Sequence, residues 1–492
     1  MNLATAAHAE MLRDGFQPDF SADTQTQIAQ VRATAANRLQ TPGVTDLRSL
    51  LWSSIDNDTS RDLDQIEWAE RTPQGIRVLI GVADVDAAVA KGSPIDKHAA
   101  AQTTSVYTPA VVFPMIPTEL STDLTSLDEN VDRLAVVVEY TVNMNAPDNE
   151  CNVDGLLLNT KIYRALVHNR AQLAYDGVGN WLEGRTAPPA KVAASTDLQA
   201  QLHLQDEAAR MLQKHRILCG ALEFDRAEAE ADMQDNQVQD LKARKKTRAN
   251  DIIEDFMIAA NETMARTLLK AGRSSIRRVV RTPKRWDRIV ALAAEHGTQL
   301  PAEPDSGALN AFLIKQKTAD PVHYPDISLS VIKLMGPGIY VLTNPNDPDQ
   351  AHFGLAAHDY THSTAPNRRF ADVITQRVMK ALLTNQPPPY SDDELTTIAD
   401  HCTEMEDAAR KVERTTLKMA AALSLAPHVG QTYSAVVTGA SDKGTYVRIT
   451  DPPVEGRVMQ GAKGLDVGDE LNVKLLHVNP ERGFIDFASL RT

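Results

Sequence analysis

The order of apolar and polar residues divides the chain into three parts. In the first part, about residues 1–45, apolar residues recur at helical spacing within AAHAEMLRDG and again within DTQTQIAQVRATAANRLQ. Thr41-Pro42-Gly43 ends this pattern, because proline and glycine interrupt helices. The segment therefore predicts two short helices, at most a small unit such as a helix-turn-helix.

The second part, about residues 46–425, mixes strand and helix patterns. GIRVLIGVADV (75–85) and RLAVVVEYTVN (133–143) are rich in valine and isoleucine and predict strands. In residues 249–272, apolar residues recur at helical spacing until Gly272, which predicts one helix. Residues 393–423 predict one or two more helices. We expect one large α+β domain here.

The third part, about residues 428–492, has a different composition. Glycines recur between short strand-like runs such as TYSAVVTGA, GTYVRI, DELNVKLLHV and GFIDFA. Five short strands within so few residues predict a small closed β-barrel.

Charge and cysteine content narrow the classes of protein. The chain has 492 residues and a net charge of −14, which taken alone argues against a nucleic-acid partner. Two basic runs, in residues 242–248 and 273–288, offer local exceptions, although a solvated face is the favoured interpretation of either run taken alone. The absence of a long apolar run argues against a membrane span, and the first residues lack a signal-peptide pattern. The cysteines Cys151, Cys219 and Cys402 form no Cys-x-x-Cys pair, so we expect free thiols in a reducing cytoplasm.

The most informative segment is SSIDNDTSRDLDQIE (53–67), which carries five acids: Asp56, Asp58, Asp62, Asp64 and Glu67. So many carboxylates repel one another unless a cation lies among them, and oxygen ligands suit a hard cation such as Mg²⁺. Two other interpretations remain open. One is a solvated acidic turn. The other is an EF-hand calcium loop, although Arg61 stands where that loop needs glycine.

The same segment resembles the catalytic signature of the ribonuclease II and ribonuclease R family of 3′-to-5′ exoribonucleases, in its RNB domain. The similarity continues in residues 81–139, in RAQLAYDGV (170–178), GALEFDRAEAE (220–230) and ANDIIEDFMIAAN (249–261), and in HFGLAAHDYTHSTAPNRRFAD (352–372). It covers about residues 46–425 in order and spacing. The last 65 residues or so are similar to the RNA-binding barrel of the OB type that commonly closes these enzymes. The resemblance implies three parts: a short helical segment (1–45), an RNB catalytic domain (46–425) and an OB-fold barrel (428–492).

The chain departs from the family pattern at three points. About 45 residues before the catalytic domain are too few for the two cold-shock barrels that usually stand there, so we expect a short variant with a more open entrance for RNA. Gln65 replaces the fourth aspartate of the signature. The arginine block reads APNRRF where the family usually has SPIRRY.

The resemblance implies roles for the acidic and basic residues. Asp56, Asp62, Asp64 and Gln65 are the expected metal ligands, with Mg²⁺ as the cation and Mn²⁺ as a substitute. Two such ions can activate water, neutralise the phosphoryl oxygens and stabilise the leaving 3′-oxygen. Asp64, Arg368 and Asp62 are the expected catalytic residues, since Arg368 aligns with the arginine at the scissile phosphate.

The resemblance also implies an RNA-binding set. Tyr175 and Phe224 align with aromatic residues that stack on the terminal bases, and such stacking tolerates any base. Glu254 aligns with an acid that contacts the terminal nucleotide, and Arg369 is a second phosphate contact. In each case an ordinary structural role is the alternative. Candidates in the barrel are Tyr433, Tyr446, Arg448 and Lys474. His352, His358 and His362 flank the arginine block, and we expect them to be structural or to line the RNA channel.

Taken together, the sequence predicts a monomeric α+β exoribonuclease of the cytoplasm. It would hydrolyse single-stranded RNA from the 3′ end and release nucleoside 5′-monophosphates. The alternative is an RNA-binding protein that keeps the RNB fold but is catalytically impaired, with Gln65 as the cause.

Overall fold

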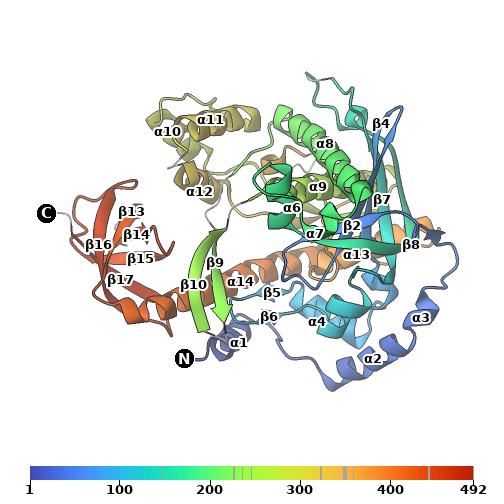
Figure 1. Ribbon diagram of the computed structural model, residues 1–492, viewed down its shortest axis with the longest axis horizontal. Helices are drawn as coiled ribbons and strands as arrows, with labels where there is room; N and C mark the ends of the chain where they lie inside the picture. Colours follow the sequence, from blue (N-terminus) through green and yellow to red (C-terminus); the bar gives the residue numbers. More distant parts are fainter. Residues whose placement is uncertain are drawn as a thin grey trace.

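The structure, a computed structural model, describes residues 1–492 except 148, 225–227, 235–236, 245, 322–323, 347–351, 358, 442–443 and 491–492. It has a mixed α+β architecture that ends in a β-barrel, which confirms the predicted fold class. Figure 1 shows the barrel at one end of the molecule and the long helix α14 (Asp392–Leu425) running from the main body to it.

The main body is built on a six-stranded sheet with the order β1-β8-β2-β3-β4-β7. Its strands are β1 (Thr45–Asp46), β2 (Trp52–Asp56), β3 (Gln65–Thr72), β4 (Gly75–Ala83), β7 (Asp132–Val142) and β8 (Leu157–Ala174). The first part of β8 pairs with β7 and its last part pairs with β2, so the sheet curls back on itself. The predicted strands at 75–85 and 133–143 are confirmed as β4 and β7.

The turn between β3 and β4 depends on Gly75. Its φ is +141°, and a Cβ at this position would lie 2.0 Å from the carbonyl oxygen of Val142. Only glycine therefore allows β7 to lie this close to the hairpin. In the sheet, β3 lies between β2 and β4, and the acidic segment runs from β2 into β3.

Helices surround the sheet. Those of the main body are α4 (Pro94–Gln102), α5 (Val153–Leu156), α6 (Tyr175–Leu182), α7 (Ala190–Ala193), α8 (Thr196–Leu218), α9 (Arg248–Lys270) and α13 (Phe370–Leu383), with the short turns η1 (Val85–Ala87), η2 (Leu120–Leu124) and η3 (Phe353–Leu355). Apolar residues of α8, α9 and α13 share one hydrophobic core with β3, β4 and β7. The helices predicted at 249–272 and 393–423 are confirmed as α9 and α14, and a Ser391–Glu394 capping box begins α14.

The remaining elements lie around this core. The N-terminal helices are α1 (Leu3–Arg13), α2 (Ala22–Ala33) and α3 (Ala35–Arg38), and α1 packs against α14. A second helical cluster comprises α10 (Trp286–Glu295), α11 (Ser306–Ala319) and α12 (Tyr324–Met335). Three two-stranded sheets pair β5 (Val106–Tyr107) with β6 (Val112–Phe113), β9 (Glu228–Gln234) with β10 (Gln237–Arg244), and β11 (Ser275–Val279) with β12 (Ile339–Thr343).

The barrel contains the five strands that the glycine-rich tail predicted. They are β13 (Thr432–Ser441), β14 (Gly444–Ile449), β15 (Glu455–Gln460), β16 (Glu470–Asn479) and β17 (Phe484–Ser489), closed in the order β13-β14-β15-β17-β16. The end of α14 inserts Ala421, Ala422 and Leu425 into the apolar core of the barrel, and the turn η4 (Ala426–His428) leads into it. The helix and the barrel therefore form a continuous packed unit.

The cysteines differ from the expectation. Cys151 and Cys219 form a disulfide, whereas Cys402 is a buried free thiol. The prediction of three thiols is wrong for the first two, because the end of α8 folds back onto the segment before α5. Proximity across 68 residues of chain cannot be read from cysteine spacing. No helix in the described part of the chain is both long and apolar enough to cross a bilayer.

Candidate active site

The acidic segment is held between the end of β2 and the start of β3. Asp56 ends β2, and Gln65 begins β3 and pairs with Val82. Between them, Leu63 is buried and its backbone N–H donates to the hydroxyl of Ser126. Its carbonyl accepts from the N–H of Leu127, so the buried leucine fixes the path of the acidic loop.

Asp64 follows Leu63 in this loop and is only 3% exposed. The backbone N–H of Asn367 donates to its Oδ1 at 2.8 Å, and Nε of Arg368 lies 3.5 Å from its Oδ2. Burial raises the pKa of Asp64 to about 8, even though Arg368 and the Asn367 N–H lower it. The protein therefore removes a carboxyl group from water here and only partly compensates its charge.

Asp56 and Asp62 lie beside Asp64. Oδ1 of Asp56 accepts from the N–H of Asn57 and from the hydroxyl of Ser60, whereas burial raises its pKa and the charge of Asp62 adds to this effect. Oδ2 of Asp62 accepts from the hydroxyl of Tyr107 at 2.9 Å. Because the charges of Asp62 and Asp64 also act on each other, the three carboxyl groups share one electrostatic environment.

The chemistry of this donor set fits a divalent cation. The groups are oxygen donors with excess negative charge, and a cation would stabilise the ionised form of Asp64 in place of the missing water. Within the part of the chain that the structure describes, however, no three histidine, cysteine or acidic side chains are close enough together to hold a metal ion. Of the predicted ligands, Asp62 acts electrostatically on both Asp56 and Asp64. Gln65 follows at the start of β3 and is partly buried.

Glu67 lies in a different environment from the other acids of the segment. It pairs with Ser53 across β2 and β3 and is fully buried, and neither of its carboxyl oxygens has a hydrogen-bond partner among the described residues. Burial raises its pKa well above the usual value, and Asp56 adds to the shift. Since Glu67 stands within a sheet strand, the segment is not a twelve-residue EF-hand loop, and the burial of Asp64 and Glu67 excludes a solvated acidic turn.

The arginine block reaches the acids from the N-terminal end of α13. The carbonyl of Arg368 accepts from the N–H of Ser105, while its side chain stays 45% exposed beside Asp64. Arg369 instead forms two hydrogen bonds with Asp372, whose Oδ1 also accepts from the N–H of Ala365. Arg368 is therefore available to an incoming anion, whereas Arg369 holds the loop that carries Asn367 and Arg368.

A cavity of about 240 Å³ opens beside this arrangement. It lies between the arginine block, β5 and α14, and its lining includes Tyr107, Arg368, Arg369, Glu406, Arg410 and Glu413. Tyr107 was not singled out by the sequence analysis, nor was Asn367, although both lie within the blocks that resemble the family. No local signal identifies them, because their contacts to Asp62 and Asp64 come from residues 45 and 303 positions away.

The predicted RNA-binding residues occupy different surroundings. Tyr175 follows Ala174, which pairs with Asp56 across β8 and β2, so this tyrosine begins α6 directly beside the acidic loop. Glu254 lies on α9 and pairs with Lys246. Phe224 is half-buried against the cluster formed by α10, α11 and α12, apart from the cluster that contains Tyr175. The fold thus places Tyr175 next to the acids but does not pack the two aromatic rings against each other.

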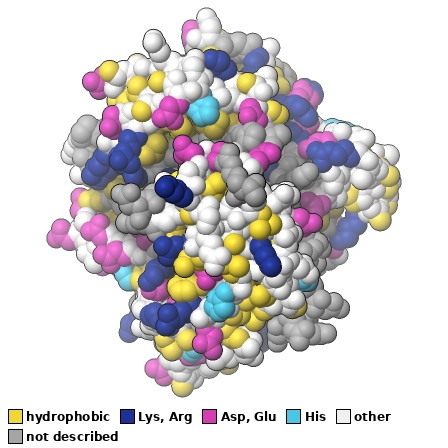
Figure 2. Space-filling model, turned by 90° about the vertical axis from the view of Figure 1, so that its left-hand side faces the viewer, with side chains coloured by type: hydrophobic (Ala, Val, Ile, Leu, Met, Phe, Trp, Pro, Cys, Tyr) yellow, Lys and Arg dark blue, Asp and Glu magenta, His cyan; other side chains and the backbone are white. Residues whose placement is uncertain are grey.

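The RNA-binding candidates of the barrel differ in their exposure and in their contacts with the rest of the protein. In the barrel, Arg448 pairs with Asp326 of α12, Tyr433 and Tyr446 are partly buried, and Lys474 is exposed. Figure 2, which views the molecule from the barrel side, shows lysine and arginine interspersed with acids and no single basic patch on that face.

The basic run at 273–288 is not wholly a solvated face, because two of its arginines are buried. Arg277 pairs with Asp359, and Arg278 pairs with Glu406. His352 and His362 contact the ring of Tyr360 and are structural in this sense, whereas His358 lies outside the described residues. The side chains of residues 228–245 are likewise outside the description.

Comparison with known protein families finds two matches along the chain. Residues 44–385 match the RNB domain, and residues 431–490 match the RNase II-type exonuclease C-terminal S1 domain. Among curated relatives, Ribonuclease R 1 of Lactococcus lactis is 30% identical over 85% of this chain and 50% of its own length. Ribonuclease R of Thermotoga maritima is 28% identical over 90% of this chain and 64% of its own length. The chain thus spans about half to two thirds of these relatives.

The fold agrees with this comparison. The solved structure of Mycoplasma genitalium RNase R in complex with ribose methylated single-stranded RNA superposes with a TM-score of 0.85 at 22% identity, over 99% of this chain and 78% of the other.

Proposed function

The chain belongs to the RNB family, and from this premise we propose that it is a 3′-to-5′ exoribonuclease that releases nucleoside 5′-monophosphates. The observation that carries the proposal is the enclosure of Asp64 by Asn367 and Arg368, with Asp56 and Asp62 beside it. A buried carboxyl whose charge is undercompensated, next to a partly exposed guanidinium, is suited to binding a cation and a phosphodiester together.

We assign each residue a task in hydrolysis. Asp56, Asp62, Asp64 and Gln65 would hold Mg²⁺ or Mn²⁺, which supplies an activated water and neutralises phosphoryl charge when bound. Arg368 binds a non-bridging phosphate oxygen, since its guanidinium is exposed and has only a long contact to Asp64.

The neighbours of these groups set their orientation. The hydroxyl of Tyr107 fixes Oδ2 of Asp62, and the Arg369–Asp372 pair fixes the loop that presents Arg368. Both contacts keep the reactive groups in place before RNA binds, which lowers the cost of reaching the transition state.

We further propose that single-stranded 3′ ends reach this site. A ribonuclease R with the same fold has been solved with single-stranded RNA, and Tyr175 stands directly beside the acidic loop, where the ring can stack on a base. Phe224 and Glu254 would contact the same end of the RNA, and the barrel would bind the RNA further upstream. We expect the protein to act as a monomer.

The competing function is RNA binding without catalysis, with Gln65 as the cause. Against it, Asp56, Asp62, Asp64 and Arg368 are all present in the sequence, and the charge of Arg368 acts on both Asp56 and Asp64. An amide oxygen at position 65 still offers a ligand of suitable hardness, although without charge. We therefore favour an active enzyme that needs more Mg²⁺ than relatives with four acids.

The test is a time course with one RNA labelled at either end. With 5′ label, a shrinking ladder is expected, and with 3′ label the signal should appear at once as mononucleotide. EDTA should stop both reactions. Asp64→Asn should bind RNA but lose most of the rate, whereas the control Asp58→Asn, an exposed acid of the same loop, should keep it. Internal fragments, or full turnover by Asp64→Asn, would contradict the assignment.

A further inference from the structure

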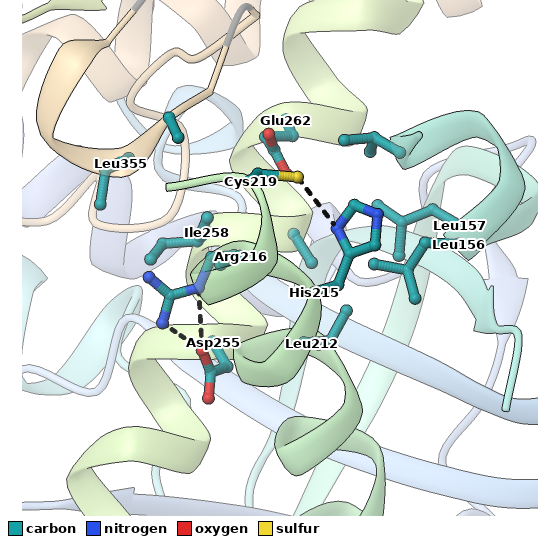
Figure 3. Close-up of a pocket in the computed structure, with 13 residues that line it drawn as sticks. Leu156, Leu157, Leu212, His215, Arg216, Cys219, Asp255, Ile258, Glu262 and Leu355 are labelled. Atoms are coloured by element: carbon teal, nitrogen blue, oxygen red, sulfur yellow. Dashed lines mark hydrogen bonds and ion pairs between the residues drawn. The ribbon is translucent and has the colours of Figure 1, made fainter. Parts of the chain in front are cut away.

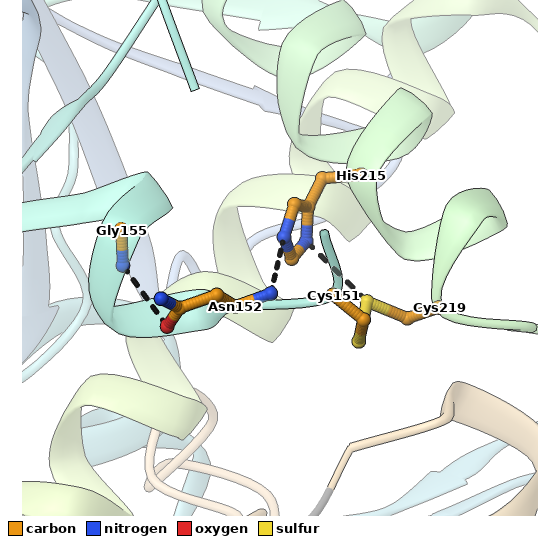
Figure 4. Close-up of a disulfide and its surroundings, with 5 residues drawn as sticks. All are labelled: Cys151, Asn152, Gly155, His215 and Cys219. Carbon is orange, nitrogen blue, oxygen red and sulfur yellow. Dashed lines mark hydrogen bonds between the residues drawn. A yellow bond between two sulfur atoms is a disulfide. The ribbon is translucent and has the colours of Figure 1, made fainter. Parts of the chain in front are cut away.

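The disulfide links two parts of the main body that are distant in sequence. Cys151 lies between β7 and α5, and Cys219 is the C-terminal cap of α8, with their Cα atoms 5.1 Å apart (Figure 4). Cys151 is exposed and Cys219 is partly buried. A dissolved thiol can therefore reach the first sulfur while the second remains within the fold.

His215 lies beside the buried side of this bond. Its Nε2 is 3.2 Å from the backbone N–H of Asn152, and its Nδ1 is 3.6 Å from Sγ of Cys219 (Figure 4). A backbone N–H only donates, so Nε2 is the acceptor. Burial lowers the pKa of His215, which favours the neutral ring. The proton of that ring must then be on Nδ1, from which it is directed at the sulfur.

The cavity beside this sulfur has other polar groups in its lining, among them Arg216, Asp255 and Glu262. Cys219 and His215 both line this cavity of about 20 Å³, which has room for one water molecule. Figure 3 shows the residues that line it. Arg216, on the same helix, pairs with Asp255 of α9. Of the residues drawn there, His215 is the one whose ring nitrogen contacts the sulfur.

The segment that follows Cys219 leads to Phe224, one of the RNA-binding candidates. The N–H of Leu222 donates to the carbonyl of Gly354, and the carbonyl of Glu223 accepts from the hydroxyl of Tyr324. The next residue is Phe224. Gly220, with φ +89°, would place a Cβ 2.8 Å from the N atom of Gly307, so this segment packs closely against the start of α11 (Ser306–Ala319). The disulfide therefore fixes the point from which residues 220–224 cross to the α10–α12 cluster.

We propose that the Cys151–Cys219 bond is a reversible redox site that regulates how tightly the protein holds the 3′ end of RNA, opened by a dithiol and closed by a disulfide oxidant. The inference rests on the proposed function for its RNA part. In the oxidised state the bond ties the start of the Phe224 segment to the chain before α5. In the reduced state this tie is lost, and the segment is held by its contacts to Gly354, Gly307 and Tyr324.

The chemistry balances as a thiol–disulfide exchange. A thiolate of the dithiol attacks Sγ of Cys151 and forms a mixed disulfide, while the electron pair of the broken bond goes to Sγ of Cys219. This sulfur leaves as a thiolate that the Nδ1–H of His215 stabilises. The second thiolate of the reductant then attacks the mixed disulfide and releases Cys151. The reductant ends as its own disulfide, and its two protons end on the two cysteines.

The experiment titrates the full chain with mixtures of reduced and oxidised dithiothreitol, in EDTA so that no RNA is cleaved. Alkylation and mass spectrometry measure the bond, and fluorescence anisotropy measures the affinity for a 3′-labelled single strand. Reduction should weaken binding by about fivefold or more, and saturating RNA should shift the redox midpoint toward the disulfide by the same factor, because such coupling is reciprocal.

Two variants separate the parts of the proposal. Cys151→Ser should bind RNA like the reduced protein at every redox ratio. His215→Gln should slow reduction of the bond without changing the affinities of the two end states. Cysteines that stay alkylatable in the oxidised buffer, a bond that no dithiol opens in the folded protein, or equal RNA affinity in both states would each overturn the proposal. Because none of these readouts requires cleavage, a chain without nuclease activity would contradict the proposed function and leave this result intact.

Discussion

Replacing Asp64 by asparagine should stabilise the metal-free protein and change how its stability depends on pH. Asparagine keeps the oxygen that accepts from the N–H of Asn367 but has no charge to bury. The pKa of Asp64 is about 8 in the fold, against an ordinary value of 3.8 for this group. Between these values the folded state binds more protons than the unfolded state, so the stability of the wild type falls as pH rises.

The size of this effect follows from the same shift. A difference of one bound proton between the folded and unfolded states changes the free energy of unfolding by about 1.4 kcal/mol for each pH unit. Between about pH 5 and about pH 7, the variant should therefore gain about 3 kcal/mol in this free energy relative to the wild type. Loss of the 3.5 Å contact to Arg368 offsets little, because that guanidinium is 45% exposed. Mg²⁺ should restore stability to the wild type and much less to the variant, because a cation supplies the charge that burial leaves uncompensated.

Urea unfolding in EDTA at a series of pH values measures this directly, with and without added Mg²⁺. Asp58→Asn is the matched control, because it removes an exposed acid from the same loop. Parallel curves of stability against pH for wild type and Asp64→Asn would show that the Asp64 carboxyl is not held in a desolvated state and would refute the reasoning.

Four further predictions concern activity. Gln65→Asp should lower the Mg²⁺ concentration for half-maximal rate, and superimposable metal titrations would show that residue 65 does not approach the cation. Arg368→Lys should lose about tenfold or more in kcat/KM, because an ammonium cannot reproduce the two-pronged contact of a guanidinium, and full rate in the lysine variant would place Arg368 outside the phosphate site. Tyr107→Phe should reduce kcat more than RNA affinity, since only the hydroxyl that orients Asp62 is lost; an equal rise in Kd would instead indicate a binding role. Tyr175→Ala should lengthen the final RNA fragment while long RNA is still attacked, and an unchanged fragment would leave Tyr175 as a packing residue.

Much of the architecture follows from local pattern. The apolar runs at 75–85 and 133–143 become β4 and β7, the helical spacing at 249–272 becomes α9, and the glycine-rich tail closes into a five-stranded barrel. These patterns are informative because the period of burial in a strand or helix is set by backbone geometry within a few residues. The family resemblance on the acidic and arginine blocks is confirmed by the match to the RNB domain.

The environment of each side chain could not be derived in this way. Asp62 and Asp64 look alike in the sequence, yet Asp64 is enclosed by a loop 303 residues away and Asp62 accepts from the hydroxyl of Tyr107. Arg368 and Arg369 are adjacent, yet one is exposed at the acids and the other is paired with Asp372. Local sequence sets which groups are present, but desolvation and charge pairing depend on which distant segments pack around them.

The same distinction applies to the cysteines. Their number and spacing gave no sign of a bond, because a disulfide requires that two Cβ atoms meet in space and not in sequence. The return of α8 onto the segment before α5 brings Cys151 and Cys219 together across 68 residues and sets His215 beside them. The chain by itself thus determined the elements, the family and the chemical groups of this protein, while tertiary packing decided which carboxyl loses its water, which arginine stays free for an anion, and which thiols are joined.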